Sequence, residues 1–239
     1  RLWGWGPAKE ALPGLKALAY VYRHPDRART TPKYDILRAY GIADDDIVFT
    51  DRPVRLRSLI GATDMWHNNQ PYSVHPDLPT VWRRIAEGLP RPDAPQFDRI
   101  FVGRGSKYRR RTCRNASAVE QLFADHGYEI IYPEKWSLPQ QAQIFGRSRV
   151  IAGFGGSGLF NMLFAQRLEA MIILNQDSYY HRNEHLFTAL LGPEVHYFWS
   201  AADLPQDASG QNLQASESDW DFDMSRHGPE LRSLLRRLS

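Results

Sequence analysis

The sequence predicts an α/β fold with a parallel sheet in its second half. Between residues 98 and 199, short apolar runs typical of buried strands alternate with segments of helical apolar spacing. Such alternation is typical of a parallel sheet with helices on both faces. A second observation is a glycine-rich turn between one of these strands and the helix that follows it. The composition, 42% hydrophobic and 24% charged, is that of an ordinary globular chain.

The best domain boundary is a proline-rich stretch at residues 89–96. Its three prolines, Pro90, Pro92 and Pro95, disfavour a helix and favour an extended linker. A length of 239 residues allows one large domain or two small ones, and the linker favours two. We therefore predict an amino-terminal α/β domain at residues 1–92 and a second domain at residues 93–239.

In the first half, apolar spacing predicts three helices and two strands. The helices are expected at residues 9–22, 32–40 and 79–87, with Gly41 ending the second one. A short strand is expected at residues 47–49 and a weaker one at residues 54–59.

In the second half, five strands are expected at residues 99–102, 129–132, 150–152, 171–174 and 195–199. Helices are expected at residues 117–126, from Ser137 onward, at 159–166 and at 185–191. Ser137 with Gln140 has the pattern of a capping box. Residues 201–225 are polar and predict a loop, and residues 229–238 predict a carboxy-terminal helix.

Composition also excludes several classes of protein. The single Cys113 rules out a disulfide framework and fits a reducing compartment, so we expect a cytoplasmic protein. No apolar run approaches the roughly 18 residues that cross a bilayer, so no transmembrane segment is expected. The net charge of +3 does not demand a nucleic-acid partner, and none is expected.

The most specific motif is the glycine turn at residues 153–158. Its glycines permit positive φ and let the backbone approach a ligand closely. The helix expected after it offers unpaired N–H groups and a positive dipole end, which suit a phosphate. The turn is neither the dinucleotide fingerprint nor a P-loop. The alternative is a tight turn whose glycines only let strand and helix pack.

Basic residues follow the first strand of the same half. Arg104 and Lys107 come just after it, so they can meet the same anion as the glycine turn if both strand ends share one rim. The whole basic cluster is Arg104, Lys107, Arg109, Arg110, Arg111 and Arg114. It can also be read as a solvated surface or a nucleic-acid patch. Only Tyr108 interleaves it, so the nucleic-acid interpretation ranks last.

Other polar residues keep two interpretations. Glu134 fits a ribose or sugar hydroxyl, or a helix cap, and Asn161 fits the ligand or the backbone of the turn. His181, His185 and His196 lack metal-ligand spacing with any carboxylate. Asp219, Asp221 and Asp223 lack the Gly and Glu of a calcium loop, so no metal site is expected.

Taken together, these motifs resemble glycosyltransferase family 61. The resemblance is carried by Val102-Gly103-Arg104, Arg111-Thr112-Cys113-Arg114-Asn115, Gly127-Tyr128-Glu129-Ile130-Ile131-Tyr132-Pro133-Glu134, Gln141 and Ile151-Ala152-Gly153-Phe154-Gly155-Gly156-Ser157-Gly158-Leu159-Phe160-Asn161. It implies a GT-B architecture of two Rossmann-like domains, with the acceptor on residues 1–92 and a nucleotide-sugar, commonly a UDP-sugar, on residues 93–239. The implied reaction is inverting and metal-independent. The nucleotide-sugar is a co-substrate, with no other cofactor.

The resemblance also implies roles for single residues and for the protein. Bacterial members of the family are often described as capsular polysaccharide biosynthesis proteins, so the acceptor is expected to be a polysaccharide or glycan and the location the cytoplasm, at the inner face of the membrane. The expected general base is Glu10, with His67 and His75 as alternatives; a helix-surface glutamate is the other interpretation of Glu10. The donor-binding residues expected are Arg104, Lys107, Glu134, Gln141, Gly155, Gly156, Ser157, Gly158 and Asn161.

The chain departs from the family pattern at four positions. The family usually has His where Gly155 stands and Thr where Phe160 stands. Ala116 replaces a frequent acidic residue, and Gly6 stands where family members have a His ahead of the phrase that is Glu10-Ala11-Leu12-Pro13 here. The alternative function is therefore a nucleotide- or sugar-binding protein on the same fold that has lost catalysis.

Overall fold

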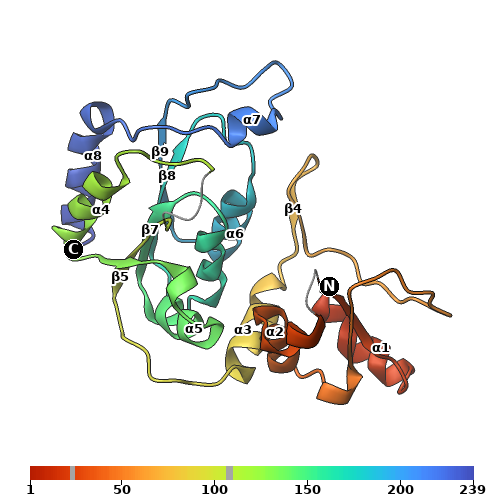
Figure 1. Cartoon of the computed structure of the whole chain (residues 1–239). Helices are drawn as coiled ribbons and strands as arrows, with labels where there is room; N and C mark the ends of the chain where they lie inside the picture. The colour runs from red at the N-terminus through yellow and green to blue at the C-terminus, as the bar shows by residue number, and fades with distance from the viewer. Residues whose placement is uncertain (22–24, 106–109) are drawn as a thin grey trace. The chain divides into compact units, whose positions relative to one another are not determined.

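The computed structural model describes residues 1–21, 25–105 and 110–239, with the backbone alone for Pro25 and Asp26. The chain divides into two compact units (Figure 1). The first unit comprises Arg1–His67 and Pro71–Pro92, and the second comprises Asn68–Gln70 and Asp93–Ser239. Within the described residues, no helix combines the length and the apolar character needed to cross a bilayer.

The first unit has a small parallel sheet and three α-helices. Strands β1 (Ala17–Tyr20) and β2 (Ile47–Thr50) pair in parallel, and β3 (Trp66–His67) pairs antiparallel with β4 (Ser73–Val74). The helices are α1 (Trp5–Ala11), α2 (Pro32–Ala39) and α3 (Leu78–Gly88), with 3₁₀ turns η1 (Leu2–Gly4), η2 (Pro25–Thr30) and η3 (Asp44–Asp46). A small core joins Leu37 of α2, Ile42 and Ile47 of β2.

Two predictions in this unit were wrong. The helix expected at residues 9–22 ends at Ala11, and residues 17–20 form strand β1 instead. Pro13 and Gly14 account for the break, because proline lacks the backbone N–H and glycine is a poor helix former. Residues 54–59 form no strand, and Leu59 is 76% exposed. Helices α2 and α3 and strand β2 confirm the other three elements.

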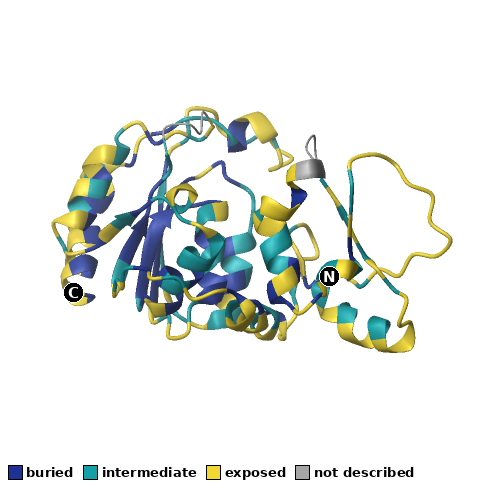
Figure 2. Ribbon diagram, turned by 60° about the horizontal axis from the view of Figure 1, so that its bottom comes forward, coloured by how far each residue is buried: buried dark blue, intermediate teal, exposed yellow. Residues whose placement is uncertain are grey.

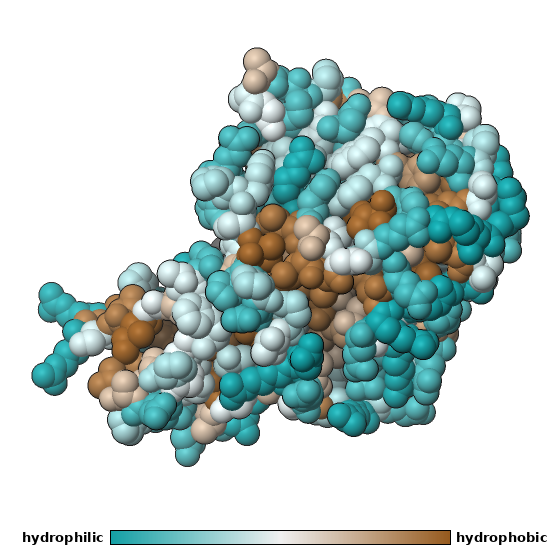
Figure 3. Space-filling model, turned by 180° about the vertical axis from the view of Figure 1, so that it is seen from behind, coloured by the Kyte–Doolittle hydropathy of each residue, from teal (hydrophilic) through white to brown (hydrophobic). Residues whose placement is uncertain are grey.

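Much apolar surface in the first unit stays exposed. Leu18 and Tyr20 of β1 and Val48 of β2 are exposed, so one face of the two-stranded sheet is uncovered. Hydrophobic residues reach the surface in several places between hydrophilic ones on the face drawn in Figure 3. The described part of this unit holds two parallel strands, so a complete Rossmann-like domain here stays a prediction.

The second unit is built on a five-stranded parallel sheet in the order β6-β5-β7-β8-β9. Its strands are β5 (Arg99–Val102), β6 (Glu129–Ile131), β7 (Val150–Phe154), β8 (Ala170–Gln176) and β9 (Glu194–Ser200). Every residue of β7 and β8 is buried, as expected for central strands covered on both faces (Figure 2). The predicted α/β fold with a parallel sheet is confirmed.

Helices cover both faces of this sheet (Figure 1). Helices α4 (Ala116–Ala124) and α8 (Met224–Arg237) lie on one face, where Phe123 and Leu235 share a core cluster with Phe101 of β5. Helices α5 (Leu138–Arg147) and α6 (Asn183–Leu191) lie on the other face, with the 3₁₀ helix η5 (Ser157–Phe164). Two short elements, η4 (Pro133–Lys135) and α7 (Leu213–Ser216), complete the unit.

Three elements of the second unit differ from expectation. The helix after the glycine turn is a 3₁₀ helix, η5, that begins at Ser157. The predicted loop at residues 201–225 contains α7, and its Trp220 is only 2% exposed. Helix α8 starts at Met224, five residues before the expected start at Pro229, which therefore lies inside the helix. The Asp223 side chain accepts the N–H of Arg226 at 3.0 Å and caps the helix at this earlier position.

The strand order places a topological switch point between β5 and β7. From β5 the chain crosses to β6 on one side, and from β6 it crosses back over β5 to β7 on the other side. Connections therefore leave β5 and β7 in opposite directions. In open parallel sheets, ligands bind beyond the carboxyl ends of the strands at such a point. Arg104 follows β5 and the glycine turn follows β7, so both lie at this edge.

Candidate functional site

The glycine turn is packed too closely for side chains at its first positions. A Cβ at Gly153 would lie 2.7 Å from the carbonyl oxygen of Val102 on β5. A Cβ at Gly155 would collide with the side-chain amide of Asn175, which is 3% exposed at the end of β8. The Gly155 N–H donates to the Leu174 carbonyl at 2.9 Å. These two glycines therefore let β5, β7 and β8 meet at the edge of the site.

Gly156 has a backbone conformation that other residues avoid. Its φ is +143° and its ψ is −175°, a region that is essentially restricted to glycine. Its N–H donates to Oε1 of Glu184 at 2.5 Å. Glu184 lies in the first turn of α6 and is 2% exposed, and burial raises the pKa of its carboxyl group. The glycine turn is thus tied to a buried acid on a neighbouring helix.

Two guanidinium groups converge on Gly156. A Cβ at this position would lie 2.9 Å from Nη2 of Arg111 and 3.0 Å from Nη1 of Arg104. Arg104 comes from the end of β5, and Arg111 comes from the segment that leads to α4. Arginine binds phosphate oxygens in a bidentate manner, so two of them beside one glycine form an anion-binding arrangement.

Arg111 is held in an unusual environment. Its φ is +54°, and its guanidinium lies 4.2 Å from the ring centroid of Tyr179. Burial raises the pKa of Tyr179 to about 12, so the phenol stays neutral. Nη1 of Arg111 is buried and has no hydrogen-bond partner among the residues that the structure describes. Buried donors are nearly always paired, so this orphaned donor indicates a place for an anionic ligand oxygen.

Helix η5 adds backbone donors at the same place. In the described part of the chain, the N–H groups of Ser157 and Gly158 donate to no protein acceptor. The first N–H groups of any helix lack partners within it. Ser157 is exposed and Gly158 is half-buried, and both directly follow Gly156 at the same edge of the sheet.

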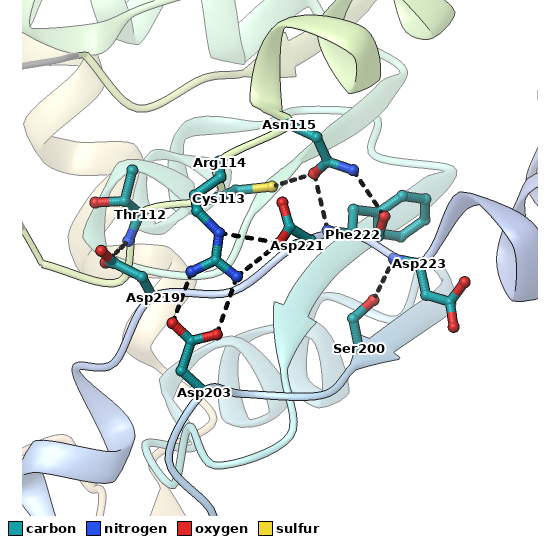
Figure 4. Close-up of polar contacts among 10 residues, drawn as sticks. All are labelled: Thr112, Cys113, Arg114, Asn115, Ser200, Asp203, Asp219, Asp221, Phe222 and Asp223. Carbon is teal, nitrogen blue, oxygen red and sulfur yellow. Dashed lines mark hydrogen bonds and ion pairs between the residues drawn. The ribbon is translucent and has the colours of Figure 1, made fainter.

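Both other described cations of the basic cluster form ion pairs with carboxylates. Arg110 forms an ion pair with Glu217 at 2.8 Å. Arg114 forms ion pairs with Asp203 and Asp221, each at 2.6 Å (Figure 4). Lys107 and Arg109 lie outside the described residues. Within the described cluster, Arg104 and Arg111 are therefore the cations that meet the glycine turn.

Gln141 and Asn161 contact each other beneath the turn. The Asn161 side-chain amide donates to Oε1 of Gln141 at 2.9 Å and to the Gly158 carbonyl at 3.3 Å. The Gln141 amide donates to the carbonyls of Pro133 and Trp136, both at 2.8 Å. These bonds join η5 to the loop after β6. Both residues thus support the shape of the turn, and a direct contact with a donor stays a prediction.

Glu134 and Glu10 lie in different surroundings. Glu134 is exposed on η4, and its carboxylate lies directly against Gly105, three residues beyond the end of β5. It is therefore at the same edge of the sheet as the arginines. Glu10 is exposed on α1 in the first unit. The alternatives there, His67 and His75, contact the backbone of Pro71 and Asp77 through their Nδ1 atoms. The general base stays a prediction.

Two cavities in the second unit lie away from the glycine turn. One cavity of about 600 Å³ includes Asp98 and Arg167, just before β5 and β8, and so lies at the amino-terminal edge of the sheet. A second of about 520 Å³ lies against Arg114 and Asp221. Among the residues that the structure describes, no group of three or more histidine, cysteine or carboxylate side chains could hold a metal ion.

Four residues of the site were not found from the sequence. Arg111 was hidden in a run of like charges, and Tyr179, Asn175 and Glu184 reach the turn only through tertiary contacts. A signal was available for Asn175, since it directly follows the apolar run of β8 at the same sheet edge. No comparable signal in the sequence separates Glu184 from a surface helix residue.

Most of the chain matches a family of known proteins. Residues 10–172, about two thirds of the chain, match the family model described as Glycosyltransferase 61. None of the curated proteins compared with the chain matches it significantly. The matched region contains Arg104, Arg111 and the glycine turn, and it ends within β8. Glu184 and the segment that carries Glu217 follow it.

Proposed function

The chain belongs to glycosyltransferase family 61, and we propose that it moves a sugar from a UDP-sugar to a polysaccharide or glycan acceptor. One observation supports a donor site at this place. The guanidinium groups of Arg104 and Arg111 meet at Gly156, at the switch point of the parallel sheet. A diphosphate has the charge and the paired oxygens that two arginines recognise.

The same groups suit the chemistry of transfer. The acceptor hydroxyl oxygen attacks the anomeric carbon, the bond from that carbon to the diphosphate breaks, and the acceptor proton passes to a base. In an inverting, metal-independent reaction, the negative charge on the departing diphosphate has to be stabilised by the protein alone. Arg104, Arg111 and the N–H groups of Ser157 and Gly158 supply this stabilisation. Glu10 is the proposed base, on an acceptor-side domain of a GT-B architecture.

One observation favours a second candidate, a protein that binds the donor without turnover. Gly155 carries no side chain, and the Asn175 amide occupies the space where a larger residue would begin. A side-chain contact to the donor from position 155 is therefore absent. Binding of the donor by the arginines does not depend on a side chain at position 155, whereas catalysis can depend on one.

The deciding experiment measures binding and turnover separately. Calorimetric titration with UDP, GDP and CMP should give one preferred nucleotide, and sugar transfer from its sugar conjugate should persist in EDTA. Loss of activity in EDTA would contradict a metal-independent reaction. Binding without hydrolysis or transfer, across a donor panel and several glycan acceptors, would favour the second candidate.

Arg104→Ala and Arg111→Ala test the site itself. Each should weaken binding of the preferred nucleotide by about tenfold or more, because charge-assisted hydrogen bonds contribute roughly 1.5–3 kcal/mol. Arg147→Ala, a helix-surface change at the end of α5, is the matched control. Unchanged nucleotide affinity in both site variants would remove this edge of the sheet from the donor site.

A further inference from the structure

The segment that carries Arg111 is paired with a segment near the carboxy terminus. The Arg111 N–H donates to the Glu217 carbonyl at 2.9 Å, and the Trp220 N–H donates to the Thr112 carbonyl at 3.0 Å. The Arg114 N–H in turn donates to the Trp220 carbonyl at 3.0 Å. Cys113 and Trp220 form an isolated parallel bridge. Residues 111–114 therefore lie on a short backbone ladder with residues 217–220.

Side chains reinforce this ladder (Figure 4). Oδ1 of Asp219 accepts the N–H of Thr112 at 2.7 Å, and Arg114 is held between Asp203 and Asp221. The Asn115 side chain accepts the Phe222 N–H at 2.9 Å and donates to its carbonyl at 2.8 Å. Polar groups thus fasten the segment at several successive residues.

The carboxy-terminal segment is itself anchored in the core. Trp220 is 2% exposed, and its ring packs edge-on against Phe154 with the centroids 6.0 Å apart. Phe154 is the last residue of β7 and the second residue of the glycine turn. The segment therefore rests on the same strand that carries the turn.

Both guanidinium groups of the site depend on the segment at residues 110–114. Arg111 belongs to this segment, and its backbone N–H is one rung of the ladder with residues 217–220. Nη2 of Arg104 donates to the carbonyl of Arg110 at 3.1 Å, and Arg110 is paired with Glu217. The position of the Arg110 carbonyl thus helps to orient Arg104 toward Gly156.

We propose that residues 203–222 form a positioning clamp, which holds Arg104 and Arg111 at Gly156 and thereby sets the affinity for the donor diphosphate. The clamp rests on the proposed function of that site. It follows the region that matches the family, so it is a contribution of this chain's own carboxy-terminal part. Holding an arginine in its binding position before the ligand arrives reduces the entropy lost on binding.

Asp219 offers the sharpest test, because it contacts the clamped segment and not the glycine turn. Asp219→Ala removes the acceptor for the Thr112 N–H, whereas Asp219→Asn keeps an oxygen at the same place. Asp98→Asn is the control, since Asp98 forms an ion pair with Arg149 before β5, at the opposite edge of the sheet. Calorimetry with the preferred nucleotide gives the dissociation constants, and hydrogen exchange reports the Arg111 and Arg114 amides.

We expect Asp219→Ala to weaken nucleotide binding about fivefold or more, the scale of immobilising one or two long side chains. Exchange at the Arg111 and Arg114 amides should rise while β7 and β8 stay protected. Asp219→Asn and Asp98→Asn should bind like the unchanged protein. Wild-type affinity in Asp219→Ala, alongside weakened binding in Arg111→Ala, would overturn the clamp alone. If Arg111→Ala also binds normally, the proposed donor site fails and the clamp falls with it.

Discussion

Gly156 is the residue on which the geometry of the candidate site depends most directly. Alanine here would adopt an essentially glycine-only conformation and push a methyl group against Arg104 and Arg111. We expect Gly156→Ala to lose roughly 1–3 kcal/mol of stability. Nucleotide affinity should fall about tenfold or more, because both charge-assisted contacts are displaced. Urea unfolding and calorimetric titration measure the two effects.

Gly192→Ala separates backbone strain from the effect on binding. Gly192 ends α6 with a φ of +74°, and a Cβ there would meet nothing within 4 Å. The Gly192→Ala variant should lose about 1–2 kcal/mol of stability, because alanine is strained in the left-handed conformation. It should bind nucleotide normally. Equal losses of affinity in both variants would mean that the glycine turn acts only through overall stability.

Glu184 gives the site a pH-dependent stability. Burial raises the pKa of its carboxyl group above the ordinary value of 4.5, although the Gly156 N–H and Arg111 oppose this shift. The folded state therefore holds the proton more tightly than the unfolded state. The stability linked to Glu184 is complete below pH 4.5 and is lost as the pH rises through the folded-state pKa.

Glu184→Gln tests this linkage, because glutamine keeps an oxygen for the Gly156 N–H and cannot ionise. We expect the stability of the unchanged protein to fall relative to Glu184→Gln as the pH rises above 4.5. Urea unfolding at a series of pH values up to 8 gives this difference directly. Parallel stability curves for the two proteins would show that the buried carboxyl group has an ordinary pKa.

Individual site residues could be predicted from the sequence only where strand ends reveal them. Arg104 and the glycine turn follow apolar runs, and parallel strands bring such ends to one edge. Arg111 could not be separated from Arg110 and Arg114, because composition does not show which cations have acidic partners far along the chain. Gln141 and Asn161 bond to each other and to backbone carbonyls, and their expected contact with the donor stays a prediction.

At the scale of elements, α5 is the helix that best combines a sequence signal with a role in the site. Ser137 and Gln140 form the expected capping box, and Gln141 then reaches the loop after β6 and Asn161. Ser137→Ala should cost about 1 kcal/mol of stability, because a backbone donor of the first turn loses its acceptor. Nucleotide binding should change little.

Ser137→Asp is the companion variant, since aspartate is also a good N-cap residue. Its stability in urea should stay near that of the unchanged protein. A stability loss in Ser137→Asp as large as that in Ser137→Ala would show that the hydroxyl contributes by some route other than capping.

Local signals predict elements well when nothing distant competes with them. Strands β5, β7 and β8 are apolar runs between glycine or polar residues, and all three occur where expected. The helix expected at residues 9–22 failed because Pro13 and Gly14 interrupt it and because β2 offers residues 17–20 a parallel partner. The burial of Trp220 in a polar segment depends on Phe154 and Thr112, which sequence spacing does not reveal.

At the scale of the whole molecule, all described groups of the candidate donor site belong to the second unit. Arg104, Arg111, Glu184 and the glycine turn lie within Asp93–Ser239, as does the clamp. The proposed base, Glu10, lies in the first unit. Nucleotide binding and sugar transfer are therefore expected to separate when the chain is divided.

A fragment of residues 93–239 should bind the preferred nucleotide with an affinity close to that of the whole chain, yet transfer no sugar. It keeps the five-stranded sheet and its core, and it loses the bond from the Arg182 N–H to Asn68 at 2.6 Å. Calorimetry and a transfer assay measure the two properties, and Arg111→Ala within the fragment checks that the site is the same. Transfer by the fragment would place both acceptor and base on the second unit and exclude Glu10. A folded fragment with no affinity would mean that the first unit completes the donor site.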